Sequence, residues 1–276
     1  GISPTAVMDF ANEFYGFNSA TSTQTDTVSL TRTGLATMTD ASGNLVWGPH
    51  NYAKNSQGPT MSSSANLVNA TIAVNSTTAP DGTMTAAKIT EDTSALVHTY
   101  QHLNAVSSTF PVSGRGVWVK AGERDRVAVG AISSGGSAVH YAIVDLTDGS
   151  IVADDGTAWT VTAAGDGWYL VSLAGWTDTA RVRVVVQILE SAAVTPTAYT
   201  GDGTSGVYIW GVHGYRSDLG GMADNPDTGT SYVPTTSAAV YLPRRNHSVY
   251  NGTDWTTLTG YRHESAAATN LLTSTD

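Results

Sequence analysis

Four side chains on two predicted strands have the chemistry to bind a sugar. In the run V-W-V-K the valines point to one side of a strand, so Trp118 and Lys120 point to the other. Further along the chain, valines and an isoleucine alternate in the same way with Arg183 and Gln187. A flat aromatic ring stacks on the C–H face of a pyranose, and guanidinium or amide groups bind its hydroxyls.

If these two strands lie in one sheet, the four residues form one exposed binding patch. Such a patch predicts that Trp118→Ala weakens ligand binding while the melting temperature barely moves, because exposed residues contribute little to folding. The alternative is that Trp118 covers the rim of the core or an oligomer contact, and that the arginines are only solvated.

The acidic residues are candidates for glycosidase chemistry, which requires two carboxylates about 5 to 9 Å apart across a sugar site. Most of them stand beside Gly or Thr in evident turns, where a short acidic side chain binds its own backbone. We therefore predict turn roles, no catalytic residue and no enzymatic activity. The acidic residues considered are Asp145, Asp148, Asp154, Asp155, Asp166, Asp202 and Glu190.

Metal binding has weak support. His98 and His102 share a strand face, and His140 is a third candidate ligand, but no fixed spacing joins the three. The chain contains no Cys, so it has no disulfide and no Cys-ligated metal. We expect no cofactor, with a structural calcium bound by turn oxygens as the one option kept open.

Composition restricts the partners. The chain has 276 residues and a formal net charge of −10, which repels phosphate backbones and anionic lipids. No apolar run approaches the length of about 18 residues that indicates a membrane span. We expect neither a nucleic-acid partner nor membrane insertion.

Predicted strands recur every ten to fifteen residues or so, with Gly and Asp turns between them and no convincing long helix. This pattern is typical of an all-β sandwich. The most apolar strand spans residues 207–210, with the segment 230–236 as its delayed partner. Trp210 is predicted to lie in the core, with Ile209 on the other side of a central strand.

The organisation predicted for the chain has four parts. Residues 1–27 form an N-terminal attachment segment, whose Phe spacing fits one helical face about as well as a short irregular anchor. Residues 28–64 form a β-hairpin and a connecting loop, and residues 65–243 form the sandwich, which is long enough to fold alone. Residues 244–276 form a C-terminal hairpin and tail.

An ordered set of sequence strings resembles the jelly-roll domains of tailed-phage and prophage tail-fibre, head-fibre and spike proteins, which are similar to carbohydrate-binding modules. The resemblance spans residues 28–243, and the set is far more specific than any one string. The strings are N-A-T-I-A-V-N-S-T-T-A-P-D-G-T-M-T-A-A-K-I from Asn69, V-W-V-K-A-G-E-R from Val117, V-D-L-T-D-G-S-I-V from Val144, G-D-G-W-Y-L-V-S from Gly165, G-D-G-T-S-G-V-Y-I-W-G from Gly201 and T-S-Y-V-P-T-T from Thr230.

The resemblance implies a jelly-roll β-sandwich that binds host-surface glycan or polysaccharide at the surface of a virion or phage-like particle. It also implies attachment to other particle proteins through the N-terminal segment, and a homo-oligomer, with a trimer as one option. The family pattern carries no fixed catalytic set. Two alternatives stay open: a structural connector or decoration protein without glycan binding, and the accessory binding module of a larger polysaccharide-degrading enzyme. The end of the chain, at residues 269–274, resembles the opening of a further module.

Overall fold

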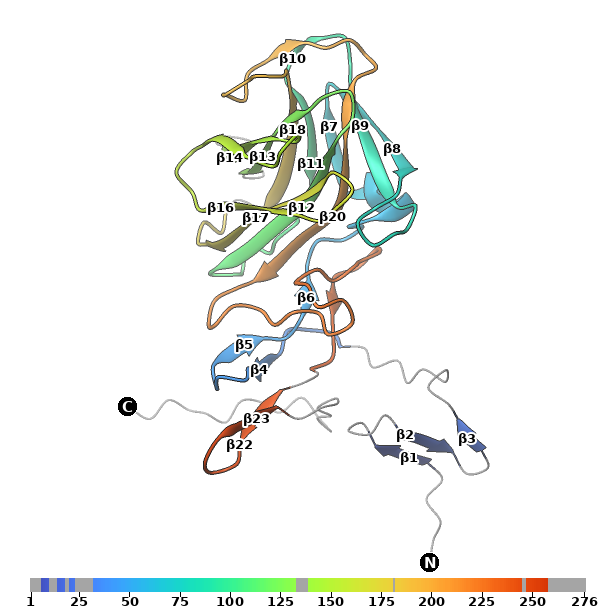
Figure 1. The fold of residues 1–276 in the computed structure, drawn as a ribbon, viewed down its shortest axis with the longest axis vertical. Helices are drawn as coiled ribbons and strands as arrows, with labels where there is room; N and C mark the ends of the chain where they lie inside the picture. The colour runs from blue at the N-terminus through green and yellow to red at the C-terminus, as the bar shows by residue number, and fades with distance from the viewer. Residues whose placement is uncertain are drawn as a thin grey trace, which may run out of the picture.

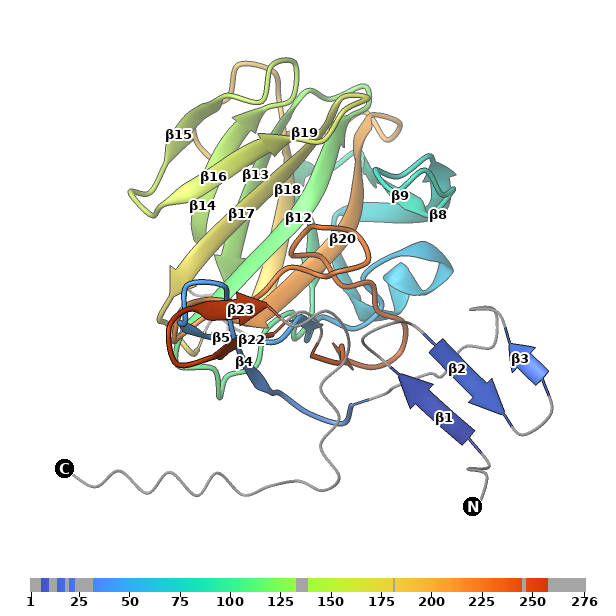
Figure 2. The same ribbon diagram turned by 60° about the horizontal axis from the view of Figure 1, so that its bottom comes forward.

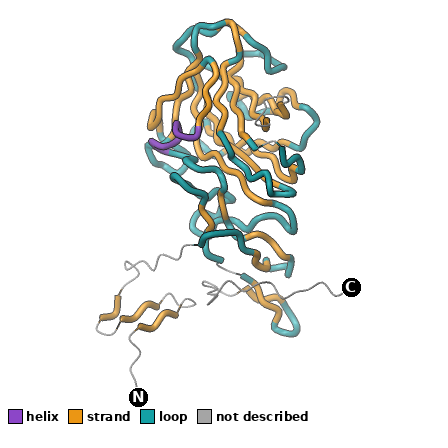
Figure 3. The backbone as a smooth tube through the Cα atoms, turned by 180° about the vertical axis from the view of Figure 1, so that it is seen from behind, coloured by secondary structure: helices purple, strands orange, loops and turns teal. Residues whose placement is uncertain are grey.

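The fold is a jelly-roll β-sandwich, seen in a computed structural model (Figure 1). The structure describes residues 6–9, 14–17, 20–22, 32–132, 139–180, 182–244 and 247–257. Within these ranges the only helix is a 3-10 helix, η1 (Gly58–Ser64), and strands and loops make up the rest (Figure 3). No helix in the described ranges is long and apolar enough to cross a membrane. The predicted all-β fold is confirmed.

Two six-stranded antiparallel sheets pack face to face. The first sheet has the order β15 (Ile151–Asp154), β14 (Val139–Asp145), β13 (Arg126–Ile132), β18 (Arg183–Leu189), β11 (His98–His102) and β7 (Ala65–Val68). The second sheet has the order β16 (Trp159–Ala163), β17 (Trp168–Trp176), β12 (Ser113–Ala121), β20 (Gly206–Arg216), β9 (Ala86–Glu91) and β8 (Ala70–Thr77). Strand β20 lies inside its sheet between β12 and β9, which confirms the central position predicted for it.

Alternation along the strands fills the space between the sheets. Val117 and Val119 of β12 are fully buried in this layer together with Ile209 of β20. Val186 and Ile188 of β18 supply the opposite wall. Burial of each such side chain stabilises the fold by about 1.5–3 kcal/mol. Because the valines of β12 face inward, the residues between them point away from the interlayer core.

The first two strands of the sandwich differ from their prediction. The alternating pattern of residues 65–75 predicts one strand, but β7 and β8 are separate strands that belong to different sheets. The break is at Asn69, whose φ of 51° is left-handed, a conformation that Asn tolerates better than most residues. The chain therefore crosses from one layer to the other at this residue.

A β-bulge shapes the centre of the second sheet. Gly116 pairs with His213 and Trp118 pairs with Trp210, so β20 carries one more residue than β12 between these pairs. Gly211 lies in the bulge with a φ of 65°. A Cβ at Gly211 would lie 2.6 Å from Cε3 of Trp118, so the close approach also requires glycine. Trp210 points outward by alternation with Ile209, and the extra residue allows Val212 to face the interlayer core.

Short strands extend the fold below the sandwich (Figure 1). The predicted hairpin around residues 40–44 is present as β4 (Thr37–Thr39) and β5 (Leu45–Trp47). A second hairpin joins β22 (Ser248–Tyr250) and β23 (Trp255–Thr257), as expected for the C-terminal part. The Gly and Pro at residues 48–49 predict an interruption of strand pairing over residues 48–52, but β6 (His50–Asn51) pairs with β21 (Val240–Tyr241). At the upper end, β10 (Ala95–Leu96) pairs with β19 (Tyr199–Thr200).

The N-terminal segment contains strands, so the helical option for it is wrong. β1 (Ala6–Asp9), β2 (Phe14–Phe17) and β3 (Ala20–Ser22) form a small antiparallel sheet. Its role in attachment stays a prediction. Residues 28–31 of the predicted hairpin and residues 258–276 of the predicted tail lie outside the described residues.

The sandwich core includes residues that precede position 65. Ala53 and Met61 are fully buried in the interlayer core, and Tyr52 packs against it. The boundary at residue 65 stays a prediction. A fragment that begins there lacks these three side chains, whereas one that begins at residue 48 keeps them.

Candidate functional site

The four predicted binding residues do not form one patch. Trp118 and Lys120 lie on β12 of the second sheet, whereas Arg183 and Gln187 lie on β18 of the first sheet. Their side chains point away from the interlayer core, so the two pairs lie on opposite faces of the sandwich. The condition for a single patch, that both strands share one sheet, is not met.

Arg183 and Gln187 form hydrogen bonds within the first sheet and with the loop that follows β18. Arg183 donates through Nη1 to Oε1 of Gln101, at 2.6 Å. Gln187 is only 7% exposed and donates through Nε2 to the carbonyl of Thr197, at 3.3 Å. The loop after β18 therefore covers Gln187, which removes it from an open surface.

Trp118 is buried, not exposed. Only 6% of its surface is accessible, because it lies in an aromatic cluster with Trp210 and Tyr232 on the outer face of the second sheet. Its ring centroid is 5.2 Å from that of Trp210 and 5.0 Å from that of Tyr232, and the ring planes cross at 69° and 70°. Edge-to-face contacts of this kind add about 0.5–1.5 kcal/mol each to the burial of the rings. The alternative in which Trp118 covers part of a core fits this geometry.

The loop that follows β20 forms the cover over this face (Figure 2). It carries Tyr232, whose ring packs on both tryptophans, with a centroid distance of 4.8 Å to Trp210. The hydroxyl of Tyr232 lies 2.8 Å from Oγ of Ser56 and donates to Oε1 of Gln57 at 3.1 Å. Burial raises the pKa of Tyr232 well above its usual value, so the phenol stays neutral.

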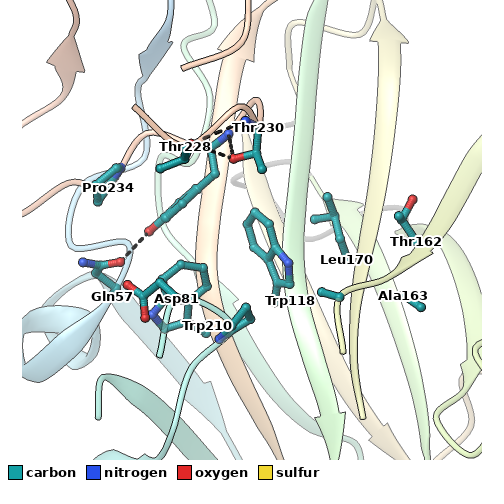
Figure 4. A pocket seen from close by; sticks show the side chains of 13 residues that line it. Gln57, Asp81, Trp118, Thr162, Ala163, Leu170, Trp210, Thr228, Thr230 and Pro234 are labelled. Atoms are coloured by element: carbon teal, nitrogen blue, oxygen red, sulfur yellow. Dashed lines mark hydrogen bonds between the residues drawn. The ribbon is translucent and has the colours of Figure 1, made fainter. Parts of the chain in front are cut away.

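A pocket of about 610 Å³ opens beside the aromatic cluster. Figure 4 shows Trp118 between two sets of lining residues. One side includes the polar residues Gln57, Asp81, Thr228 and Thr230, and the other includes Thr162, Ala163 and Leu170 of β16 and β17. The residues that line the pocket are Gln57, Pro80, Asp81, Trp118, Thr162, Ala163, Ala164, Leu170, Trp210, Thr228, Thr230, Tyr232 and Pro234. They come from segments far apart in the sequence, so the site exists only in the folded chain.

A chain of hydrogen bonds connects the pocket floor to its acidic rim. The indole N–H of Trp210 donates to Oγ1 of Thr85 at 2.9 Å, and the hydroxyls of Thr85 and Thr83 lie 2.6 Å apart. The hydroxyl of Thr83 then donates to Oδ1 of Asp81 at 2.6 Å, and its backbone N–H donates to the same oxygen at 3.0 Å. These bonds fix Asp81 in a turn beside the pocket and orient the indole of Trp210.

A histidine lies behind the aromatic cluster. His213 is 2% exposed, and its ring centroid is 5.5 Å from that of Trp118 and 5.9 Å from that of Tyr232. Burial lowers the pKa of His213 to about 4. The imidazole is therefore neutral at physiological pH and serves as a packing group.

The turn role predicted for the acidic residues is confirmed at five positions. In each case the carboxylate accepts the backbone N–H of the residue two positions later, as in an Asx turn. These residues are Asp145, Asp148, Asp154, Asp155 and Asp202. Asp166 has a φ of 50° in the turn before β17. For Glu190 the hydrogen bond within its turn is accepted by its backbone carbonyl, from the N–H of Ala193.

One carboxylate outside that set is buried, and it has a structural role. Glu91 accepts two hydrogen bonds from Arg124, at 2.5 and 3.0 Å, and one from the backbone N–H of Asp202 at 2.9 Å. The hydroxyl of Tyr199 also donates to it. Burial acts to raise the pKa of Glu91, but these hydrogen bonds and the charge of Arg124 outweigh it and hold the pKa below its usual value. Both oxygens are occupied, so Glu91 is not placed to act on a substrate.

The histidines considered as metal ligands lie in separate places. His98 and His102 are fully buried on the inner side of β11, where Nδ1 of His98 lies 2.7 Å from the carbonyl of Asn69 and Nδ1 of His102 lies 2.7 Å from the hydroxyl of Tyr100. His140 pairs with Asp155 at 2.5 Å. Among the described residues no three His, Asp or Glu side chains are grouped so as to hold a metal ion.

Comparison with known proteins finds similarity to solved structures alone. No protein-family model and no curated protein matches the chain. Among solved structures, TmCBM61 in complex with β-1,4-galactotriose is similar over 60% of this chain and 98% of that chain, with 12% identity and a TM-score of 0.33. Carbohydrate-binding modules of the β-sandwich superfamily with promiscuous specificity are similar over 75% of this chain and 83% of that chain, with 13% identity and a TM-score of 0.33.

An exo-β-agarase is similar over 61% of this chain and 25% of its own chain, with 11% identity and a TM-score of 0.37. The similar region is a quarter of that protein's length.

Sequence analysis did not find most of the pocket. Trp118 was selected as a candidate, but Trp210 was assigned to the core, and Gln57, Asp81 and Thr162 were not considered as contacts. The one available signal was the segment T-S-Y-V-P-T-T, which we associated with residues 207–210 and which supplies Tyr232.

Proposed function

We propose that the chain is a non-catalytic glycan-binding module whose ligand lies in the pocket beside Trp118. The observation that carries this proposal is the composition of the pocket: indole and phenol rings at its base, and hydroxyl, amide and carboxylate groups around it. Apolar rings can pack against the C–H face of a sugar ring, while the surrounding polar groups bind hydroxyls and fix its orientation.

The polar groups come from both sides of the pocket. Thr228 and Thr230 belong to the loop after β20, whereas Thr162 stands at the end of β16, opposite Leu170 of β17 (Figure 4). These three threonines are exposed. Their hydroxyls can donate to and accept from a ligand without loss of any buried hydrogen bond.

We further propose that this module acts at the surface of a phage or phage-like particle, binds host-surface polysaccharide and attaches to other particle proteins as a homo-oligomer. This context is supported by the sequence resemblance over residues 28–243.

The test uses a substitution that blocks the pocket and leaves the aromatic cluster in place. Thr162→Trp places a large side chain at the pocket, and Thr71→Trp makes the same change at an exposed residue on β8, at the other edge of the same sheet. We expect the unmodified protein and Thr71→Trp to bind on a glycan array or to purified surface polysaccharide, and Thr162→Trp to lose at least about tenfold in affinity. Equal binding by both variants would place the ligand elsewhere. Binding to no glycan would reject the function.

A second candidate, a structural connector, is favoured by an exposed apolar surface at the lower end of the fold. Leu45, Leu219, Tyr250 and Trp255 are between 43% and 56% exposed. The indole of Trp255 lies against Gly43, and Gly220, next to Leu219, donates its N–H to the carbonyl of Leu45 at 2.9 Å. Exposed apolar surface of this kind is typical of a contact between proteins. Loss of particle incorporation in Trp255→Ser, with glycan binding intact, would support this role in addition to the first.

A further inference from the structure

We propose that the pocket selects uncharged glycans, and that Asp81 sets this selection by accepting a hydrogen bond from a sugar hydroxyl and repelling uronic-acid and sulfated residues. This inference rests on the proposed glycan binding and specifies its ligand class. It differs from the expectation of a cationic binding face, which Lys120 and Arg183 were to supply.

The charge of the pocket supports this selection. Among the described residues that line it, Asp81 is the only one that carries a formal charge at neutral pH, and it is exposed. The other polar lining groups are hydroxyls and an amide, and the neighbouring His213 is neutral. These lining residues include no Lys, Arg or charged His that could pair with an anionic ligand. They do include hydrogen-bond acceptors for the hydroxyls of a sugar.

Two lysines on the outer face of this sheet are directed elsewhere. The ammonium group of Lys120 lies 5.9 Å from the ring centroid of Trp168, and that of Lys88 donates to Glu123 at 2.8 Å. Neither residue lines the pocket. The negative charge of Asp81 is therefore not cancelled by a direct ion pair with either of them.

The position of Asp81 is fixed by the turn between β8 and β9. Its Oδ1 accepts both the backbone N–H and the hydroxyl of Thr83, and Thr83 continues through Thr85 to the indole of Trp210. The carboxylate of Asp81 is thus held by two hydrogen bonds from Thr83, and its charge also contributes, after burial, to the raised pKa of Tyr232. A fixed charge discriminates between ligands better than one on a freely rotating side chain.

The experiment compares ligands of the same sugar type and linkage, one of each pair with an acidic group and the other without. Galacto-oligosaccharides are paired with oligogalacturonates, and gluco-oligosaccharides with their glucuronate and sulfated counterparts, and affinities are measured by calorimetry or on an array. The proteins are the unmodified chain, Asp81→Asn and Asp148→Asn. Asn keeps the oxygen that accepts in an Asx turn, so Asp81→Asn preserves the turn. Asp148→Asn makes the same charge change in an exposed Asx turn of the other sheet.

We expect the unmodified protein and Asp148→Asn to prefer the uncharged member of a pair. In Asp81→Asn the affinity for the acidic member, relative to its uncharged partner, should rise about threefold or more, as removal of a nearby like charge predicts. The preference of the unmodified protein should also weaken as salt screens the repulsion.

Equal affinity for both members, or an unchanged ratio in Asp81→Asn, would overturn the role of Asp81 and leave the glycan-binding proposal intact. If the unmodified protein showed no glycan binding that Thr162→Trp abolishes, both the glycan-binding proposal and the role of Asp81 would be overturned.

Discussion

Trp118 and Trp210 lie directly opposite each other on β12 and β20, with ring centroids 5.2 Å apart and planes inclined at 69°. This cross-strand pair faces away from the interlayer core, and Tyr232 closes over it from the following loop. The pair thus forms a second, smaller core on the outside of the sheet. Its one open side is the floor of the pocket.

Trp118→Ala should destabilise the fold by about 3–5 kcal/mol, because it removes a buried indole from contact with two other rings. This corrects the expectation that the melting temperature barely moves. Chemical denaturation measures the cost, and Trp118→Phe, which keeps a ring, should lose less. A cost below about 1 kcal/mol for Trp118→Ala would show that the ring is exposed in solution.

Trp210→Ala should also cost about 3–5 kcal/mol. The side chain is 3% exposed, and its N–H donates to Thr85, so the substitution leaves a cavity and removes this hydrogen bond. Thr85→Val keeps the indole but removes its acceptor and the hydroxyl contact with Thr83, and it should cost about 1–3 kcal/mol, the penalty of an unsatisfied buried donor. Urea unfolding of both variants separates the two contributions. Equal costs for both would contradict the packing role of the indole.

Gly211→Ala should destabilise the protein through both backbone strain and a clash with Trp118. The φ of Gly211 is 65°, and an added Cβ would lie 2.6 Å from Cε3 of Trp118. Strain of this kind costs about 1–3 kcal/mol. The control is Gly175→Ala, at a φ of 72° with no atom within 4 Å of the new Cβ, which should show strain alone. If the two variants melt at the same temperature, the contact with Trp118 contributes nothing.

Stability should fall as the pH decreases from about 6.5 toward 4. Burial lowers the pKa of His50, His102 and His213 to about 4, so the unfolded chain binds protons at these residues in a pH range where the folded chain does not. A folded-state pKa below the unfolded value means that stability rises with pH across this window. Each histidine should remove about 2 kcal/mol of stability at pH 5 relative to pH 8.

The measurement is the melting temperature between pH 4.5 and pH 8. The lower end of this range overlaps the titration of ordinary carboxylates, which the compared proteins share, so the difference between them isolates the imidazole. His213→Gln should make the dependence shallower, because it removes one of the three buried imidazoles. A melting temperature independent of pH in this range would mean that the three imidazoles reach water in the folded state.

Glu91→Gln should destabilise the fold by about 3–5 kcal/mol, since it breaks a buried ion pair and places an amide where four donors converge. Glu123→Gln is the matched control, because the Glu123 side chain is 53% exposed and its pairing with Lys88 is worth less than about 1 kcal/mol. Denaturant unfolding of both compares a buried with an exposed carboxylate. Similar costs would indicate that water reaches Glu91.

The sequence by itself determined the features that depend on neighbouring residues. The two-residue period of V-W-V-K is enough to place Trp118 and Lys120 on the side opposite the valines, and the structure has them there. The turns at Asp145, Asp148 and Asp202 depend on side-chain bonds to the backbone two positions later, which are equally local. Recurrent strands and turns were sufficient for the sandwich.

Only the tertiary structure decided which strands share a sheet and what covers each face. Nothing in the alternation of β12 or β18 specifies their partners, because every amphipathic strand presents the same two-residue period. Trp118 and Arg183 lie in different sheets because the chain crosses from one sheet to the other at points such as Asn69, and no local sequence pattern predicts these crossings. Trp118 is buried because Tyr232, which lies 114 positions later in the sequence, folds back over it. A contact over that distance depends on the closure of the whole domain, so the pocket could be found only in three dimensions.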